Sequence, residues 1–414
     1  MTRSRHVVIV GGSVAGLMAG NVLARLGWEV DVFERAPGAL EDRGAGITIL
    51  PGLVGGLRAA GVDATEDSLG IELPARIALD RSGRIIGERP FSQVMMSWRR
   101  LYESLLEVFP GRYHLGTALE HLEQGECGVT ASFAGGASVD ADLVIGADGL
   151  RSTVRRLVLP EVEPSYPGYI AWRCLTDETE LTASTASMLL ERYAICVAPG
   201  EQGIGYPVPG RAPGGRQYNV VWYHPVREAD ELPRMLTDDA GRSHPNGIAP
   251  ALIRDGVREE MRQLAGRVLA PQFAEAIQRA RVEFFQPIVD LESPRLVFGR
   301  VVLVGDAAFV ARPHVAMGVP KAFGDVHALV LALQEAGDLK AGLRAFEAER
   351  LRVGRAIVGA GRRLGAYMEA QLGSDEARRR AEELRDVDEL LTKTAAPADY
   401  GERLGAAEPS PSSA

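Results

Sequence analysis

The distribution of apolar positions over the first 34 residues predicts a β-α-β unit. Residues 6–10 are a short β-branched run that ends at two glycines, and residues 14–26 carry apolar side chains at helical spacing before Gly27. A second strand-like run follows at residues 29–33. Because parallel strands need a crossover of this kind, we expect these residues to begin a parallel sheet.

Two later apolar runs predict strands that return to the same sheet. Residues 140–145 lead into Gly146-Ala147-Asp148-Gly149, and residues 300–304 lead into Gly305-Asp306. In contrast, the stretches at about residues 71–99 and 165–230 contain segments that alternate apolar and polar side chains. This alternation predicts a second, largely antiparallel sheet, which the chain visits between strands of the first.

This order predicts an α/β fold with two interleaved domains and a helical C-terminus. A Rossmann-like, dinucleotide-binding domain is assigned to residues 1–70, 100–164 and 285–335, and a mostly antiparallel β-sheet substrate domain to residues 71–99 and 165–284. Residues 336–394 are assigned to C-terminal helices, with helical spacing over residues 319–336, 339–372 and 375–391. The segment 395–414 lacks the apolar residues that would offset its ordering entropy, so it is predicted to be disordered.

Composition narrows the classes of function. The 414 residues are 46% hydrophobic and 24% charged, which is typical of a globular protein. The net charge of −9 and the absence of a dense basic run disfavour binding to nucleic acid or an anionic membrane. Three cysteines without CxxC spacing and seven histidines without an HExxH motif indicate neither a disulfide framework nor a metal site.

The apolar stretch at residues 7–19 follows two arginines, which is also a feature of signal peptides. Three glycines interrupt this stretch and a second strand follows directly, so the β-α-β interpretation is favoured. The sequence contains no uninterrupted apolar run long enough to cross a bilayer. We therefore expect a cytoplasmic protein.

The turn Gly11-Gly12-Ser13-Val14-Ala15-Gly16 carries the first sign of a ligand. It joins a strand to a helix, whose N-terminal N–H groups and partial positive charge suit a pyrophosphate. Ser13 replaces the second glycine of the G-x-G-x-x-G fingerprint. Glu34 closes the second strand, at the place of the acid that binds ribose hydroxyls.

The ends of three predicted strands indicate a single crevice. In an open parallel sheet the ligand lies beyond the carboxyl ends of the strands, and Gly11, Asp148 and Asp306 each follow such an end. The alternative is that the two aspartates only cap turns or helix starts. A further helix is predicted to begin near Gly318, and its N-terminus would favour a negative charge on a nearby ring by about 1–2 kcal/mol.

Several segments together resemble one enzyme family. GGSVAG, FER at residues 33–35, GADGLRSTVR at 146–155 and GDAAFVARPHVAMG at 305–318 resemble the signatures of the class A, single-component FAD-dependent aromatic hydroxylases, of which p-hydroxybenzoate hydroxylase is typical. The 2,6-dihydroxypyridine 3-hydroxylase branch is more similar. It has a similar GGS turn, a GY-x-x-WR segment like residues 168–173, a YP-x-PG segment like residues 206–210, and RPH before the helix.

The resemblance extends over about residues 5–370 and implies roles for individual residues. Glu34 would bind the adenosine ribose, Asp148 would lie in the segment associated with both FAD and NAD(P)H, and Asp306 would hold the ribityl chain. The full set of residues implied to bind the cofactor is Gly11, Gly12, Ser13, Val14, Ala15, Gly16, Glu34, Arg35, Arg99, Asp148, Asp306, Gly318, Val319 and Pro320.

Two departures from the family pattern concern the same cofactor. The family often has an arginine at the start of the helix that is predicted near Trp98, and alignment places Trp98 itself there, with Arg99 beside it. The family motif G-Q-G-x-N reads Ala316-Met317-Gly318-Val319-Pro320, so its Gln and Asn are absent.

A set of polar and aromatic residues is expected to serve the substrate. An acceptor for a phenolic proton would accelerate ring attack, because ionising a phenol at neutral pH costs about 4 kcal/mol. The candidates for catalysis are Arg173, Tyr206, His224 and His314, and those for binding the substrate are Trp172, Trp222 and Tyr223. Arginine cannot act as the base but could stabilise a phenolate. The alternatives are that the histidines cap a helix or lie exposed, and that the tryptophans and tyrosines are core residues.

By this resemblance the chain is an FAD-dependent monooxygenase that uses NAD(P)H and O2 to hydroxylate a small electron-rich aromatic or N-heteroaromatic substrate through a flavin C4a-hydroperoxide. Only one glycine fingerprint with an acidic partner is visible, so NADPH or NADH is expected to visit transiently. The alternatives are an FAD-dependent dehydrogenase or oxidase without oxygen insertion, and a non-catalytic flavin-binding regulatory protein. The oligomeric state stays open, a homodimer included.

Overall fold

The computed structural model describes residues 5–38, 40, 46–50, 52–65, 69–210, 212, 214–245 and 247–396. Of the segment predicted to be disordered, residues 397–414 lie outside these ranges.

Within the described residues the strands fall into four sheets. The strands are β1 (His6–Val10), β2 (Glu29–Phe33), β3 (Gly46–Ile49), β4 (Ile71–Asp80), β5 (Ile85–Ser97), β6 (Arg112–His114), β7 (Leu119–Gln124), β8 (Val129–Phe133), β9 (Ser138–Ala141), β10 (Leu143–Gly146), β11 (Tyr169–Asp177), β12 (Arg192–Ala198), β13 (Glu201–Pro209), β14 (Arg216–Pro225), β15 (Val282–Pro287), β16 (Leu291–Glu292), β17 (Val297–Phe298), β18 (Val301–Leu303) and β19 (Phe309–Val310).

Helices of very different length connect these strands. The α-helices are α1 (Val14–Arg25), α2 (Leu53–Ala59), α4 (Trp98–Glu107), α5 (Thr153–Val158), α6 (Ala183–Leu189), α7 (Glu231–Met235), α8 (Asp255–Val268), α9 (Pro271–Gln278), α10 (Gly318–Glu335), α11 (Leu339–Ala370), α12 (Asp375–Glu383) and α13 (Val387–Lys393), and the 3-10 helices are η1 (Glu178–Glu180), η2 (Pro250–Leu252), η3 (Gly305–Ala307) and η4 (Pro313–Val315).

The first sheet has the order β17-β18-β10-β1-β2-β6. The five strands from β18 to β6 run parallel, and β17 is antiparallel to β18. Val7, Val8 and Ile9 of β1 are fully buried, as expected of a central parallel strand that is covered on both faces. The β-branched runs recognised in the sequence are therefore strands of one sheet.

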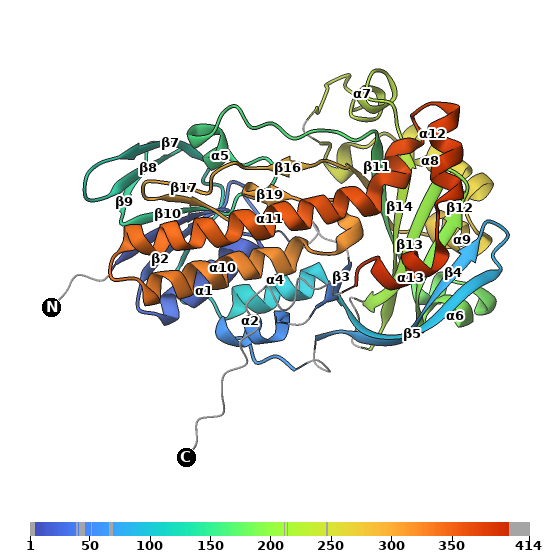
Figure 1. The fold of residues 1–414 in the computed structure, drawn as a ribbon, viewed down its shortest axis with the longest axis horizontal. Helices are drawn as coiled ribbons and strands as arrows, with labels where there is room; N and C mark the ends of the chain where they lie inside the picture. The colour runs from blue at the N-terminus through green and yellow to red at the C-terminus, as the bar shows by residue number, and fades with distance from the viewer. Residues whose placement is uncertain are drawn as a thin grey trace, which may run out of the picture.

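Helices and a small sheet cover this first sheet. Helix α1 packs against α4 and α10, and α10 packs against α11 (Figure 1). The three-stranded sheet β7-β8-β9 contacts β1 and β10 through β9 and β8. The small sheet was not predicted, and the predicted strand at residues 140–145 is in fact the end of β9 and the start of β10, with Asp142 between them. Arg300 donates a hydrogen bond to the carbonyl of Asp142 at this break.

The second sheet has the order β15-β11-β14-β13-β12-β4-β5-β3. All neighbours are antiparallel except β12 and β4. Helices α6 and α9 pack against one face, while α11 and α13 pack against the other. The two sheets and the C-terminal helices confirm the predicted α/β class. Strand β3 belongs to the second sheet although it lies within residues 1–70, and the domain boundaries as a whole stay a prediction.

Helix α11 connects the two halves of the molecule, since it runs from the first sheet to the second (Figure 1). The helix predicted for residues 375–391 is wrong in one respect, because it is divided into α12 and α13. Asp386 accepts hydrogen bonds from the first N–H groups of α13, and Arg385 turns inward to donate to the carbonyls of Ala198 and Glu201. This tertiary contact favours the break over a continuous helix.

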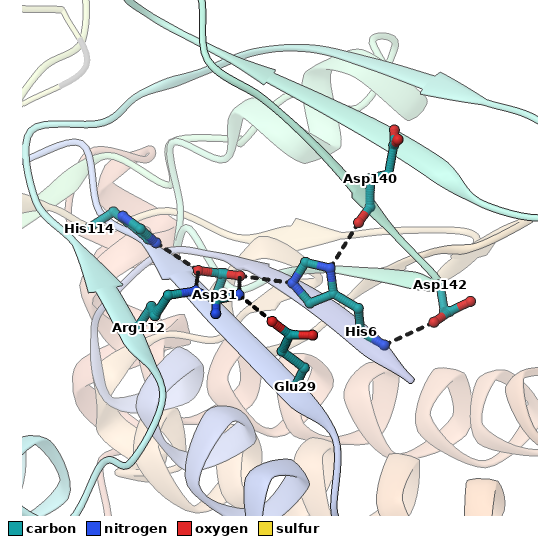
Figure 2. Close-up of polar contacts among 7 residues, drawn as sticks. All are labelled: His6, Glu29, Asp31, Arg112, His114, Asp140 and Asp142. Atoms are coloured by element: carbon teal, nitrogen blue, oxygen red, sulfur yellow. Dashed lines mark hydrogen bonds and ion pairs between the residues drawn. The ribbon is translucent and has the colours of Figure 1, made fainter. Parts of the chain in front are cut away.

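A buried carboxylate holds the edge of the first sheet together (Figure 2). Asp31 on β2 is 3% exposed and accepts hydrogen bonds from Arg112 and His114 of β6, while His6 of β1 lies 2.8 Å from its Oδ2. Burial by itself raises the pKa of Asp31, but the hydrogen bonds from Arg112, His114 and His6 outweigh it and hold the pKa below its ordinary value. Asp31 therefore joins three parallel strands as an anion.

The Asp31 cluster predicts a dependence of stability on acid. The pKa of Asp31 is lower in the folded chain than in the unfolded one, so its contribution is present above pH 4 or so and is lost as pH falls through the folded pKa. We expect Asp31→Asn to lower the free energy of unfolding by about 2 kcal/mol at pH 7 and to remove part of the acid sensitivity, measured by urea unfolding at pH 7 and pH 3. Asp230→Asn, at a surface ion pair, is the control and should change little.

Candidate functional site

The turn between β1 and α1 has the geometry of a phosphate-binding loop. Gly11 has φ of +108°, and a Cβ there would lie 2.4 Å from the carbonyl oxygen of Ala147. A Cβ on Gly16 would lie 1.8 Å from the carbonyl oxygen of Gly11. The N-cap, Ser13, makes no capping hydrogen bond, and the first turn of α1 has no acidic residue. The helix therefore presents uncapped N–H groups and its partial positive charge at this turn.

Three distant segments meet at this turn, as the strand ends predicted. A Cβ on Gly11 would lie 2.7 Å from the Cα of Asp148, and one on Gly305 would lie 3.2 Å from the Cβ of Ala15. The three segments therefore pack closely around the N-terminus of α1, with the Cβ of Ala15 as the contact for Gly305.

A buried arginine ties two of these segments together. Arg155 on α5 is 3% exposed, and its guanidinium donates to the carbonyls of Ala307 (3.0 Å) and Leu150 (2.6 Å). Sequence reasoning missed Arg155, because a lone arginine on a short helix usually indicates a solvated face.

Glu34 lies beside the turn and shapes it. Its Oε2 accepts from the N–H of Gly12 at 3.0 Å, and its Oε1 accepts from the N–H of Ala36 at 2.8 Å. Each carboxylate oxygen has a second lone pair, so Glu34 can still accept from a ribose hydroxyl. Arg35 beside it is exposed.

Asp148 caps the helix that follows it. Its carboxylate accepts from the hydroxyl of Ser152 and from the backbone N–H groups of Thr153 and Val154 at the start of α5. Burial raises the pKa of Asp148 above its ordinary value, although these hydrogen bonds oppose the shift. Asp148 therefore caps α5, which was the alternative interpretation of its place in the sequence. A role of Asp148 in binding a cofactor stays a prediction.

Asp306 follows β18 and lies beside a buried lysine. Its side chain is 48% exposed, and its Oδ1 lies 3.5 Å from the Nζ of Lys321 on α10. Lys321 is 1% exposed, and its Nζ has no hydrogen-bond partner among the described residues. The loop itself is held from behind, because the N–H of Gly305 donates to Asp325, which is paired with the buried Arg350.

The N-terminus of α10 forms the other wall. Its N-cap, Met317, makes no capping hydrogen bond, and the first turn has no acidic residue. A Cβ on Gly318 would meet nothing within 4 Å. Val319 is half-buried and Pro320 is buried. A flat ring can therefore approach the backbone at Gly318.

These residues fit a dinucleotide. The uncapped α1 N-terminus suits a pyrophosphate, Glu34 suits a ribose, and the buried Nζ of Lys321, which lacks a hydrogen-bond partner among the described residues, suits an anionic group. Arg99, also implied to bind the cofactor, forms an ion pair with Glu103 on α4.

One face of the second sheet meets the loop before α10. We call it the inner face and define it by Arg173, Gln202, Tyr206, Asn219 and Tyr223. The strand register and the alternation of side chains place all five on one side of the sheet. This side carries the core that also includes residues of α11 and α13.

His314 of η4 lies against this face. It is fully buried, its ring stacks on Tyr223 with centroids 4.0 Å apart, and its Nε2 lies 3.0 Å from the hydroxyl of Tyr169. Burial lowers the pKa of His314 to about 3, and the charges of Arg312 and Arg173 act in the same direction. The imidazole is therefore neutral at physiological pH, and its Nδ1 has no partner among the described residues.

The prediction that Trp172, Trp222 and His224 share this site is not supported. All three project from the opposite face, where the tryptophans pack in the core under α6, α8 and α9. Glu201 accepts from the indole N–H of Trp222 and lies 2.9 Å from His224. The reason is the two-residue period of a strand, which separates Tyr223 from its neighbours in sequence. Tyr206 and Tyr223 lie on the inner face as core residues.

Known proteins share this arrangement. A family model described as FAD binding domain-like matches residues 166–290, and one described as pyridine nucleotide-disulphide oxidoreductase matches residues 6–62. The chain is 32% identical over 361 residues to 2,6-dihydroxypyridine 3-monooxygenase of Paenarthrobacter nicotinovorans, which covers 85% of this chain and 89% of that protein.

The chain belongs to the FAD-dependent aromatic monooxygenases. The structure of 2,6-dihydroxypyridine-3-hydroxylase from Arthrobacter nicotinovorans matches the present structure with a TM-score of 0.84 at 30% identity, over 89% of this chain and 93% of that one. Klebsiella pneumoniae HpxO complexed with FAD and uric acid matches with a TM-score of 0.74 at 25% identity, over 94% and 93% of the two chains.

These relatives confirm the predicted family and FAD as its cofactor, and they support neither the dehydrogenase or oxidase alternative nor the regulatory one. Across the part of the monooxygenase that the structure describes, no helix has the length and apolarity to span a membrane.

The buried ammonium of Lys321, which lacks a hydrogen-bond partner among the described residues, predicts a contribution to FAD binding. Because a buried charge without a hydrogen bond is costly, even at 3.5 Å from the half-exposed carboxylate of Asp306, Lys321→Met should stabilise the apoprotein and yet raise the dissociation constant of FAD by about tenfold. Flavin fluorescence titration of apoprotein and thermal unfolding measure the two effects. Lys340→Met, at an exposed lysine, is the matched control. An unchanged FAD affinity in Lys321→Met would contradict the assignment.

The neutral His314 predicts a second pH dependence. The unfolded chain takes up the proton near pH 6.5 and the folded chain only near pH 3, so stability falls as pH drops through this window. Between pH 7 and pH 5 the loss should be about 2 kcal/mol. His314→Gln should remove that part of the slope in urea unfolding, whereas His121→Gln, at an exposed histidine, should keep it. Equal slopes in the two variants would disprove the assignment.

Proposed function

We propose that this monooxygenase uses NAD(P)H and O2 to hydroxylate a small, hydroxylated N-heteroaromatic ring that binds on the inner face. The proposal is supported by the similarity to a dihydroxypyridine monooxygenase and by the chemistry of the inner face. An electron-rich ring of this kind is one that an electrophilic oxygen attacks readily.

The observation that carries the proposal is the environment of Arg173. Its guanidinium has no ion pair with any carboxylate among the described residues, and its Nε is buried without a hydrogen-bond partner. The charge of Arg173 opposes the rise that burial gives to the pKa values of Tyr206 and Tyr223, and it adds to the fall in the pKa of His314. All three side chains therefore lie near it. An unpaired cation among aromatic side chains suits a planar anion.

Arg173, His314 and the aromatic side chains have different roles in this proposal. Arg173 binds a ring oxygen as the anion, which lowers the cost of ionising the ring hydroxyl and makes the ring electron-rich. A neutral His314 with a pKa of about 3 is a weak base, so it acts as a hydrogen-bond partner and the proton leaves to solvent when the substrate binds. The aromatic side chains exclude water from the ring.

The cofactor crevice supplies the rest. Reduced FAD supplies the activated oxygen that is inserted into the ring. The uncapped α1 N-terminus, Glu34 and Lys321 would hold its dinucleotide portion, and Gly318 and Val319 would lie against its ring system. NADPH or NADH would visit as a transient reductant.

The proposal is tested with the holoenzyme and labelled oxygen. A hydroxylated N-heteroaromatic ring should stimulate NAD(P)H consumption and should carry one atom from 18O2 in the product, as judged by mass spectrometry. NAD(P)H consumption without labelled product would contradict the hydroxylation.

Arg173 itself gives a sharper prediction. Arg173→Met should lower kcat/KM by about 100-fold or more, because an anion then loses its charged hydrogen bond, while flavin content stays unchanged. Arg192→Met is the matched control, since Arg192 lies near the start of β12 and pairs with Glu88 at the surface. Unchanged kcat/KM in Arg173→Met would remove Arg173 from the site.

A further inference from the structure

We propose that Gln202 and Asn219 bind the two ends of the substrate ring, and that Gln202 selects rings with a lactam edge, in which a ring N–H lies beside a carbonyl oxygen. The inference rests on the proposed function and deepens it, because it names the chemistry of the ring that Arg173 would hold.

The strand register places these two amides around one apolar floor. Val221 on β14 and Ile204 on β13 are paired neighbours on the inner face. One pair further along the strands in one direction is Gln202 with Tyr223, and in the other direction Tyr206 with Asn219. The two rows that hold the amides are therefore four residues apart along the strands, or about 13 Å at the backbone.

Arg173 closes a third side of this frame, because it pairs with Val221 from β11. A ring resting on Val221 and Ile204 thus has an amide at each end and a guanidinium along one edge. The frame is polar at its rim and apolar at its floor, which is the usual arrangement in a site for a small planar molecule.

Folding leaves both amides unsatisfied. Gln202 is 1% exposed, and neither its Oε1 nor its Nε2 has a hydrogen-bond partner among the described residues. Asn219 is fully buried, and its Nδ2 has no such partner. Because buried polar groups in native proteins are nearly always hydrogen-bonded, two orphaned amides on one face point to a ligand that supplies their partners.

The orientation of Asn219 follows from Gly46. The N–H of Gly46 donates to Oδ1 of Asn219 at 3.4 Å, and the carbonyl of Gly46 accepts from the hydroxyl of Tyr206 at 2.9 Å. Since an N–H must face an oxygen, the amide cannot be turned around, and the free atom is the donor Nδ2. Asn219 therefore offers a hydrogen bond only to an acceptor, such as a ring oxygen.

Gln202 offers a donor and an acceptor side by side, since both atoms of its amide are free. A lactam edge presents the complementary pair, a carbonyl that accepts and a ring N–H that donates. A phenol presents one hydroxyl and a C–H, so it would leave one atom of the amide unpaired. The amide thus discriminates an N-heteroaromatic ring from its carbocyclic counterpart, as a buried polar site rejects an analogue that lacks its partner.

The experiment compares two probes that differ only at the ring nitrogen, 2,6-dihydroxypyridine and resorcinol. Their dissociation constants are measured from the change in flavin absorption on titrating the holoenzyme. The wild type should bind the pyridine about 100-fold more tightly than resorcinol. Gln202→Met should bring this ratio below about tenfold by weakening the pyridine alone. Gln217→Met is the matched control, because Gln217 already donates to Asp177 at 2.9 Å, and it should keep the wild-type ratio.

Asn219→Asp tests the other end of the ring. It keeps the acceptor for Gly46 and replaces the donor with a charged oxygen, so both probes should bind at least about tenfold more weakly at unchanged flavin content.

Equal affinity of the wild type for the two probes, or binding of neither, would overturn the lactam inference even if Gln202→Met failed to fold. A ratio unchanged in Gln202→Met, or unchanged affinities in Asn219→Asp, would remove that residue. The failure of the proposed function is distinct, because it appears as the absence of 18O from every product.

Discussion

The close approach of three backbone turns at one edge of the parallel sheet is the constraint on which the rest of this structure depends. Gly11 has no room for a side chain against Ala147, and Gly305 packs against Ala15. Arg155 then connects the turn after β10 to the turn after β18 through hydrogen bonds to Leu150 and Ala307. The contact at Gly11 is made by backbone atoms, while Gly305 meets the Cβ of Ala15 and Arg155 bonds through its guanidinium. Together these contacts hold the three segments around the N-terminus of α1.

The second sheet is joined to this site by the helices that follow the turn at Gly305. The loop that leaves Gly305 passes through His314, which stacks on Tyr223, before α10 begins. Helix α11 then returns along both sheets (Figure 1). The loop before α10 therefore brings the inner face, whose side chains come from the three adjacent strands β11, β14 and β13, next to the start of this helix.

A common physical feature marks both halves of the site. Lys321 on α10, and Gln202, Asn219 and His314 on or against the inner face, are buried side chains with polar atoms that have no hydrogen-bond partner in the described part of the chain. At the edge of the first sheet, in contrast, the buried charge of Asp31 is paired with Arg112. Burial without a partner lowers stability, so a native chain that retains such groups is expected to regain the cost when ligands bind.

The sequence by itself determined the elements whose signals are local. The β-α-β unit, the glycine turn, Glu34 and the strand ends at Asp148 and Asp306 follow from patterns within a few residues, since such turns and strand ends obey general rules. The same local reasoning identified the FAD-dependent family from its motifs.

Tertiary structure alone decided which candidate residues lie together. Tyr223 and His224 are adjacent in sequence and lie on opposite faces, while Tyr223 and His314 are distant in sequence and stack. A strand pattern shows that side chains alternate but does not show which face meets the cofactor. The orphaned amides of Gln202 and Asn219 were equally hidden, because the lack of a hydrogen-bond partner is a property of the packed chain and has no counterpart in the residue itself.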